Sequence, residues 1–115
     1  MFLFEKLIVY QKSLEFAEHT SLLMNDFGKG NGYIVDQLQR AALSISANIA
    51  EGNGRHHQKE RLNFFWIARG SAFECVPIID LCLRKKLINK EAYNALRLEL
   101  EEIAKMLSGL IESNR

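Results

Sequence analysis

Apolar residues recur every three or four positions along four stretches of this chain, which is the spacing of an amphipathic α-helix. No stretch alternates apolar and polar residues as a half-buried strand would, and the chain contains a single proline. Together these features predict an all-α protein. The short stretches between the four periodic segments favour an antiparallel, up-down-up-down four-helix bundle.

The first two helices are predicted from about Phe4 to Phe27 and from about Tyr33 to Glu51. The segment GKGNG between them predicts a helix end and a turn. No strand precedes these glycines and no Lys-Ser/Thr follows them, so a phosphate-binding loop is not supported. The predicted inward-facing residues are Leu3, Leu7, Tyr10, Leu14, Ala17 and Met24, then Ile34, Leu38, Ala41, Ile45, Asn48 and Ile49.

The third helix is predicted from about Gln58 to Lys86, and two adjacent apolar stripes indicate burial on more than one side. Gly70 in its middle suggests that a neighbouring backbone needs space there, and Pro77 predicts a kink. The fourth helix is predicted to begin after Asn89, a good N-cap, because a heptad of apolar residues follows it. The residues of this heptad are Tyr93, Leu96, Leu100, Ile103, Leu107 and Leu110.

The chain length fits one domain spanning residues 1–115, and 48% of its residues are hydrophobic. The net charge is only +1, but residues 52–86 carry seven basic and three acidic groups, a local charge of +4. No segment is long and apolar enough for a bilayer. Cys75 and Cys82 lie about 10 Å apart along a helix, too far for a disulfide, so reduced thiols and a cytoplasmic location are expected.

The sequence offers little support for catalysis. A di-metal bundle needs Glu-x-x-His pairs on two helices, whereas Glu15 and His19 are four apart and His56 with Glu60 stands alone. Both cysteines lie on an apolar stripe, where thiols are usually inert. We therefore expect no catalytic residue, no metal, no cofactor and no enzymatic activity.

A line of polar residues at helical spacing follows the second helix: Arg40, Ser44, Asn48, Glu51 and Arg55. Arg69 interrupts an apolar stripe on the third helix, and its guanidinium should need carboxylate or carbonyl partners, which Glu51 or Glu74 could supply. This pattern predicts a structural polar network of Ser44, Asn48, Glu51, Arg69 and Glu74.

The same region also suggests a surface for a polyanion. Its candidate cations are Arg55, Lys59 and Arg61, together with Arg40. Arg84, Lys85 and Lys86, at the opposite end of the third helix, form an alternative patch.

The segments QLQRAALSISANIAEGNGR and FFWIARGSAFE resemble the bacterial four-helix-bundle proteins encoded in intervening sequences of large-subunit ribosomal RNA genes. The resemblance extends from FEKLIVYQKSLEFA to EEIAKMLSGLI, and accessory proteins of diversity-generating retroelements are similar to this family. It implies an antiparallel bundle that assembles into a homopentameric ring. For the retroelement relatives it also implies a basic surface that engages nucleic acid and a reverse transcriptase.

Two functional hypotheses follow. The first is a non-enzymatic oligomeric scaffold that binds RNA, or a protein that handles nucleic acid, through a basic surface. The alternative is a protein-interaction module without nucleic-acid affinity, because the acidic fourth helix could neutralise part of the basic segment.

Overall fold

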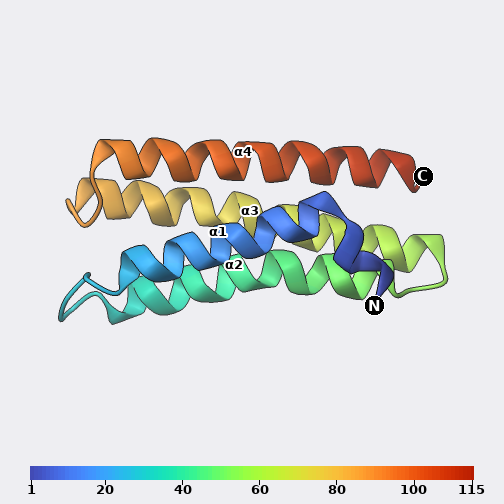
Figure 1. Ribbon diagram of the computed structural model, residues 1–115, viewed down its shortest axis with the longest axis horizontal. Helices are drawn as coiled ribbons and strands as arrows, with labels where there is room; N and C mark the ends of the chain where they lie inside the picture. Colours follow the sequence, from blue (N-terminus) through green and yellow to red (C-terminus); the bar gives the residue numbers. More distant parts are fainter.

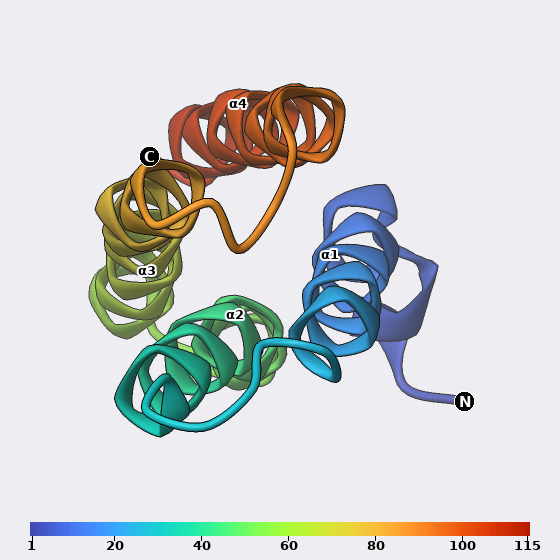
Figure 2. The ribbon, with the colours of Figure 1, turned by 90° about the vertical axis from the view of Figure 1, so that its left-hand side faces the viewer.

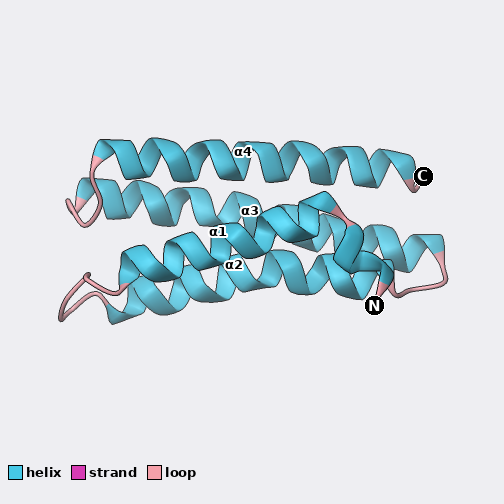
Figure 3. Cartoon of the chain, in the orientation of Figure 1, coloured by secondary structure: helices cyan, strands magenta, loops and turns pink.

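A computed structural model describes residues 1–115 and contains four α-helices and no strand. The helices are α1 (Ile8–Met24), α2 (Gly32–Asn53), α3 (Gln58–Arg84) and α4 (Lys90–Ser113); a short 3-10 helix, η1 (Leu3–Lys6), precedes them. Consecutive helices run in opposite directions and form a bundle of 44 × 23 × 21 Å (Figures 1 and 3). The predicted antiparallel four-helix bundle is confirmed.

Viewed from one end, the helices follow one another around a common core in the order α1, α2, α3, α4 (Figure 2). The pair α2–α3 has the most extensive packing, and α1–α4 has the least among neighbours in the bundle. The α1–α2 and α3–α4 loops lie at one end, whereas both termini and the α2–α3 connection lie at the other (Figure 1).

The first helix differs from the sequence prediction at both ends. Leu7 has an extended backbone, with φ −73° and ψ 125°, which interrupts the helical conformation between η1 and α1. Helix α1 therefore begins only at Ile8. Leu3 remains 75% exposed and Leu14 41% exposed, so the predicted apolar stripe of α1 was wrong at these two positions.

The buried stripe of α1 includes two hydroxyl residues, Ser13 and Thr20, beside Val9, Phe16 and Met24. Ser13 Oγ donates to the Tyr10 carbonyl (2.7 Å), and Thr20 Oγ1 donates to the Ala17 carbonyl (3.0 Å). Because each hydroxyl satisfies its hydrogen-bonding potential within the helix, burial leaves no polar group unpaired. The spacing of apolar residues alone therefore predicted a stripe of α1 next to the one that is buried.

The predicted core positions of the other helices agree better with the structure. In α2, Ile34, Leu38, Ala41, Ile45 and Ile49 are buried, and in α4 the heptad residues Leu96, Leu100, Ile103 and Leu107 are buried. Both stripes of α3 contribute, through Phe65, Ala68, Ser71, Ala72, Cys75, Ile79 and Cys82. These residues are buried against α2 and α4, while four large apolar side chains of α3 stay exposed, so burial of a further side of α3 stays a prediction.

The helix ends follow the expected local chemistry. Gly28 and Gly30 in the α1–α2 loop have φ of 76° and 90°, the left-handed region that glycine tolerates. Asn89 Oδ1 accepts a hydrogen bond from Ala92 N (2.8 Å), which confirms the predicted cap of α4. Helix α3 continues through Pro77, which lies on the exposed side of the helix.

The tight helix contact occurs at Gly52 rather than at Gly70. A side-chain carbon added to Gly70 would meet no atom within 4 Å, so the expectation of a neighbouring backbone there was wrong. The same carbon on Gly52, in the last turn of α2, would lie 2.6 Å from Phe65 Cε1 and 3.0 Å from Phe64 Cβ. Glycine at position 52 thus allows the end of α2 to meet the start of α3.

Candidate nucleic-acid interface

A partly buried polar contact joins the middles of α2 and α3. The hydroxyls of Ser44 and Ser71 hydrogen-bond to each other (2.8 Å), and Asn48 Nδ2 donates to Ser44 Oγ (3.0 Å) and to the Ser44 carbonyl (2.8 Å). These side chains satisfy one another at the most extensive helix interface, so they stabilise the pairing of the two helices. Ser44 and Asn48 therefore share one hydrogen-bonded group with Ser71, and their contribution to stability stays a prediction.

The charged members of that predicted network lie elsewhere. Arg69 Nε donates to Ser108 Oγ of α4 (2.9 Å), and its guanidinium carbon lies 4.4 Å from the centre of the Phe73 ring. Glu51 is exposed and pairs only with Arg55 (2.9 Å), and Glu74 is exposed without an ion pair. The suggested pairing of Arg69 with Glu51 or Glu74 was wrong, because the Ser108 hydroxyl and two aromatic faces accommodate the guanidinium instead.

Two of the three candidate cations near the start of α3 are already engaged within the chain. Arg61 donates to Asn114 Oδ1 from both Nε (3.2 Å) and Nη2 (2.9 Å), which ties α3 to the end of α4. Arg55 pairs with Glu51 and lies over the Phe64 ring, 4.9 Å from its centre. Lys59 is exposed without an ion pair, and Arg61 keeps its charge because Asn114 is neutral, so only Arg55 of the three is neutralised by a carboxylate.

Arg40 does not join this group. It is exposed on the middle of α2, eleven residues before Glu51, which is about 16 Å along the helix axis. The structure therefore does not gather the four predicted nucleic-acid-binding residues into one patch.

The opposite end of the bundle gathers more free cations. Residues 25–33 and 84–91 contain five basic and two acidic residues, a local charge of +3. Lys85 Nζ donates to Asn31 Oδ1 (2.8 Å) and to Tyr33 Oη (3.4 Å), so it links the two loops while keeping its charge. We call this group the loop-end cluster: Lys29, Arg84, Lys85, Lys86 and Lys90. None of the five forms an ion pair within the chain.

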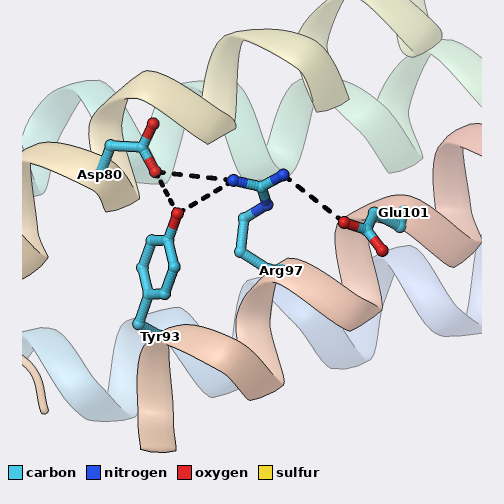
Figure 4. Close-up of polar contacts among 4 residues, drawn as sticks. All are labelled: Asp80, Tyr93, Arg97 and Glu101. Atoms are coloured by element: carbon cyan, nitrogen blue, oxygen red, sulfur yellow. Dashed lines mark hydrogen bonds and ion pairs between the residues drawn. The ribbon is translucent and has the colours of Figure 1, made fainter. Parts of the chain in front are cut away.

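A polar network that the sequence reading missed joins α3 to α4 (Figure 4). Tyr93 Oη donates to Asp80 Oδ1 (2.5 Å), and Arg97 Nη1 donates to Tyr93 Oη (2.9 Å). Arg97 Nη2 lies 3.5 Å from Glu101 Oε2 on the next turn. The spacing of Tyr93, Arg97 and Glu101, four residues apart, was the available signal, whereas Asp80 could be placed only by the fold.

An ion pair and a histidine hydrogen bond also join α1 to α4 along their weakly packed edge. Lys12 Nζ lies 2.6 Å from Glu102 Oε1, and this hydrogen bond raises the pKa of Lys12. His19 Nδ1 lies 2.8 Å from Glu99 Oε1, so His19 bonds to α4 rather than to Glu15. No three His, Cys, Asp or Glu side chains gather in a way that could hold a metal ion.

The bundle thus carries charged side chains at both of its ends. The sequence model of the 23S rRNA-intervening sequence protein family matches residues 5–109. The chain belongs to this family. A protein of unknown function from the S23 ribosomal protein family of Bacteroides thetaiotaomicron has a similar crystal structure, with 30% sequence identity and a TM-score of 0.79. The similarity covers 90% of this chain and 98% of that one.

The comparison with curated proteins found no match. Neither the description of the intervening-sequence family nor that of the Bacteroides protein mentions an enzymatic activity. No helix of this intervening-sequence protein combines the length and apolar character needed to span a membrane.

The two thiols of this intervening-sequence protein should be unreactive in the folded state. Burial raises the pKa of the Cys75 thiol from 9.0 to about 12, and burial also raises the pKa of Cys82. Since the thiolate is the reactive form, labelling of Cys75 at pH 8 with Ellman's reagent should be about a thousandfold slower than in the unfolded chain. Rapid native labelling of Cys75, located by mass spectrometry, would contradict its burial.

The same shift sets a pH dependence of stability. Well below pH 9.0 the Cys75 thiol is protonated in both the folded and the unfolded chain, so it adds no pH dependence to the free energy of unfolding. Above pH 9.0 the unfolded chain loses this proton first, so the Cys75 contribution to stability falls as pH rises toward about 12. The variant Cys75→Ser, compared with the parent at the same pH values, isolates that contribution.

Proposed function

We propose that this intervening-sequence protein is a non-enzymatic, homopentameric scaffold that binds structured RNA through phosphate contacts. The observation that carries the RNA proposal is the loop-end cluster, whose five cations have no carboxylate partner in the chain. A phosphate backbone would supply the missing negative charge, and release of its counterions would favour binding.

The distribution of charge supports this end of the bundle over the other. Residues 1–6, 51–61 and 112–115 at the opposite end carry five basic and four acidic residues, a charge of +1. Arg55 and Arg115 are paired there with Glu51 and Glu112. In a cyclic assembly each copy would repeat the loop-end charge of +3, so a ring would present a strong local field despite a net chain charge of +1.

The oligomeric part of the proposal has a separate support. Four large apolar side chains of α3 remain exposed on one copy: Trp66, Ile67, Phe73 and Leu81. Apolar groups concentrated on a single helix indicate an interaction surface. The number of five subunits is what membership of the family implies. A solution mass near 13.2 kDa, measured by light scattering at micromolar concentration, would reject assembly.

The RNA proposal predicts a steep salt dependence that the loop-end cluster controls. Replacing Arg84, Lys85 and Lys86 with glutamine should reduce the slope of log affinity against log salt by about 0.7–0.9 for each phosphate that is no longer neutralised. Binding should be measured by fluorescence anisotropy with a labelled structured RNA at several salt concentrations. The mass of the oligomer should remain that of the parent.

The matched control removes the same amount of charge at the other end, through Lys6→Gln, Arg55→Gln and Lys59→Gln. This control should leave the salt slope unchanged. If the control, and not the loop-end variant, flattens the slope, the RNA site lies at the start of α3 instead. Absence of RNA binding even at low salt would leave a protein-interaction module as the function.

A further inference from the structure

The exposed side of α3 carries an aromatic ridge built around one cation. We define the α3 ridge as Trp66, Arg69 and Phe73. Trp66 is 46% exposed and Phe73 is 53% exposed, and the guanidinium of Arg69 lies 5.6 Å and 4.4 Å from the centres of their rings. Only Nε of Arg69 hydrogen-bonds within the chain, so its two terminal amino groups are available to another molecule.

Gly70 leaves open space beside the ridge. A side-chain carbon at this position would meet nothing within 4 Å, although alanine would favour the helix by about 1 kcal/mol. Within one copy no neighbouring element approaches Gly70, so packing inside the bundle does not require a glycine at this position. A second molecule packed against α3 would use that space, since glycine permits close approach.

A groove of complementary character lies between α1 and α2. It has a volume of about 450 Å³ and is lined by Leu14, Ala17, Glu18, Ser21, Gln39, Ala42 and Leu43. Leu14 and Leu43 are 41% and 56% exposed, so the groove presents apolar surface to solvent. Glu18 is its one ionisable lining residue, and it is exposed and forms no ion pair within the chain. We call this feature the α1–α2 groove.

The ridge and the groove also differ in the sign of their surroundings. Residues 1–51, which include α1 and nearly all of α2, carry four basic and six acidic groups, a charge of −2. Helix α3 itself carries four basic and three acidic groups, a charge of +1, because Arg55, Lys85 and Lys86 lie beyond its ends. Two copies that bring the acidic groove helices against α3 would therefore attract each other, chiefly through Arg69 and Glu18.

Both surfaces lie at the same height along the bundle. The bond between Ser44 and Ser71 fixes Leu43, in the groove, level with Gly70 beside the ridge. The groove lining in turn places Leu14–Ser21 of α1 level with Gln39–Leu43 of α2. A ring whose axis runs along the helices brings equal heights of neighbouring copies together, so ridge and groove can meet.

We propose that the α3 ridge of one copy docks into the α1–α2 groove of the next, with Arg69 facing Glu18 of the neighbouring copy. The inference rests on the proposed oligomer and specifies its interface. Because the two surfaces differ, the contact is heterologous and can repeat around a closed ring. Contact through α3 alone would instead pair the same surface with itself and give a dimer.

Charge reversal at Glu18 tests the contact with little risk to folding, because this side chain is exposed and makes no bond within the chain. Glu18→Arg places two cations opposite each other and should raise the concentration needed for half-assembly by at least about tenfold. Light scattering across a dilution series measures this change. Trp66, the single tryptophan of the chain, should report it independently, since emission shifts to longer wavelength when the ring becomes more exposed.

Arg69→Glu should weaken assembly in the same way, and the double variant Arg69→Glu with Glu18→Arg should restore it. The matched controls are Asp26→Arg and Lys105→Glu, which make the same charge changes at exposed positions outside both surfaces. Neither control should change the mass. Thermal unfolding of each variant establishes that it is folded, because Arg69→Glu also removes the bond to Ser108.

The outcomes separate this inference from the proposed function. A monomeric parent protein would overturn both the oligomer and its interface. An oligomeric parent whose mass and Trp66 emission are unaffected by Glu18→Arg would overturn the ridge-in-groove contact alone. Disruption by Arg69→Glu without any effect of Glu18→Arg would also overturn it, and would point to an interface formed by α3 on both sides.

Discussion

Truncation of Leu107 to alanine is expected to lower the free energy of unfolding by about 2–5 kcal/mol. Leu107 is fully buried on α4 and belongs to the core cluster that all four helices share. Removal of its three terminal carbons would forfeit their transfer free energy and leave a cavity between rigid helices. Urea denaturation at a fixed protein concentration measures the effect, since assembly would itself add to apparent stability.

The matched control is Leu98→Ala, because Leu98 lies on the same helix but is 67% exposed. The same substitution there should change stability by less than about 0.5 kcal/mol. Equal losses at both positions would contradict the assignment of the inner face of α4. A large loss at Leu98 alone would show that the outer face of α4 is covered in solution.

Replacement of Gly52 by alanine is the second change with a large expected effect, a loss of about 1–3 kcal/mol. The new methyl group would lie 2.6 Å and 2.9 Å from two ring carbons of Phe65, and that ring is fully buried. Relief would require the end of α2 to move away from α3. The loss should appear in urea denaturation despite the intrinsic helix preference for alanine.

Gly109→Ala separates the steric effect from helix propensity. Gly109 is exposed within α4 and nothing lies within 4 Å of an added carbon, so this variant should gain up to about 1 kcal/mol. If Gly52→Ala proved as stable as the parent, the Phe65 ring would have to be freer than its burial indicates.

The fold could be predicted from the sequence wherever apolar periodicity alone determines a helix face. Leu96, Leu100, Ile103 and Leu107 show this for α4, where the heptad coincides with the buried stripe. In α1 the prediction failed, because Ser13 and Thr20 bond to their own backbone and can be buried like apolar residues. Periodicity read from hydrophobicity cannot detect such hydroxyls.

The candidate site was less predictable because it depends on partners far apart in the sequence. Spacing correctly suggested that Ser44 and Asn48 share a face of α2. It could not show that Asn114, 53 residues away, engages Arg61, or that Ser108 takes the place of a carboxylate beside Arg69. Local charge counts also could not show that Arg55 is paired with Glu51 while no cation of the loop-end cluster has a carboxylate partner, and this difference favours the loop-end cluster.

The position of both termini at one end of the bundle has a consequence for any ring built around an axis along the helices (Figure 1). Rotation about such an axis keeps every subunit pointing the same way, so the assembly is polar and has two unlike rims. One rim carries all the chain ends, and the other carries all the loop-end clusters. Proteins or labels fused to either terminus would therefore crowd a single rim and leave the cationic rim open.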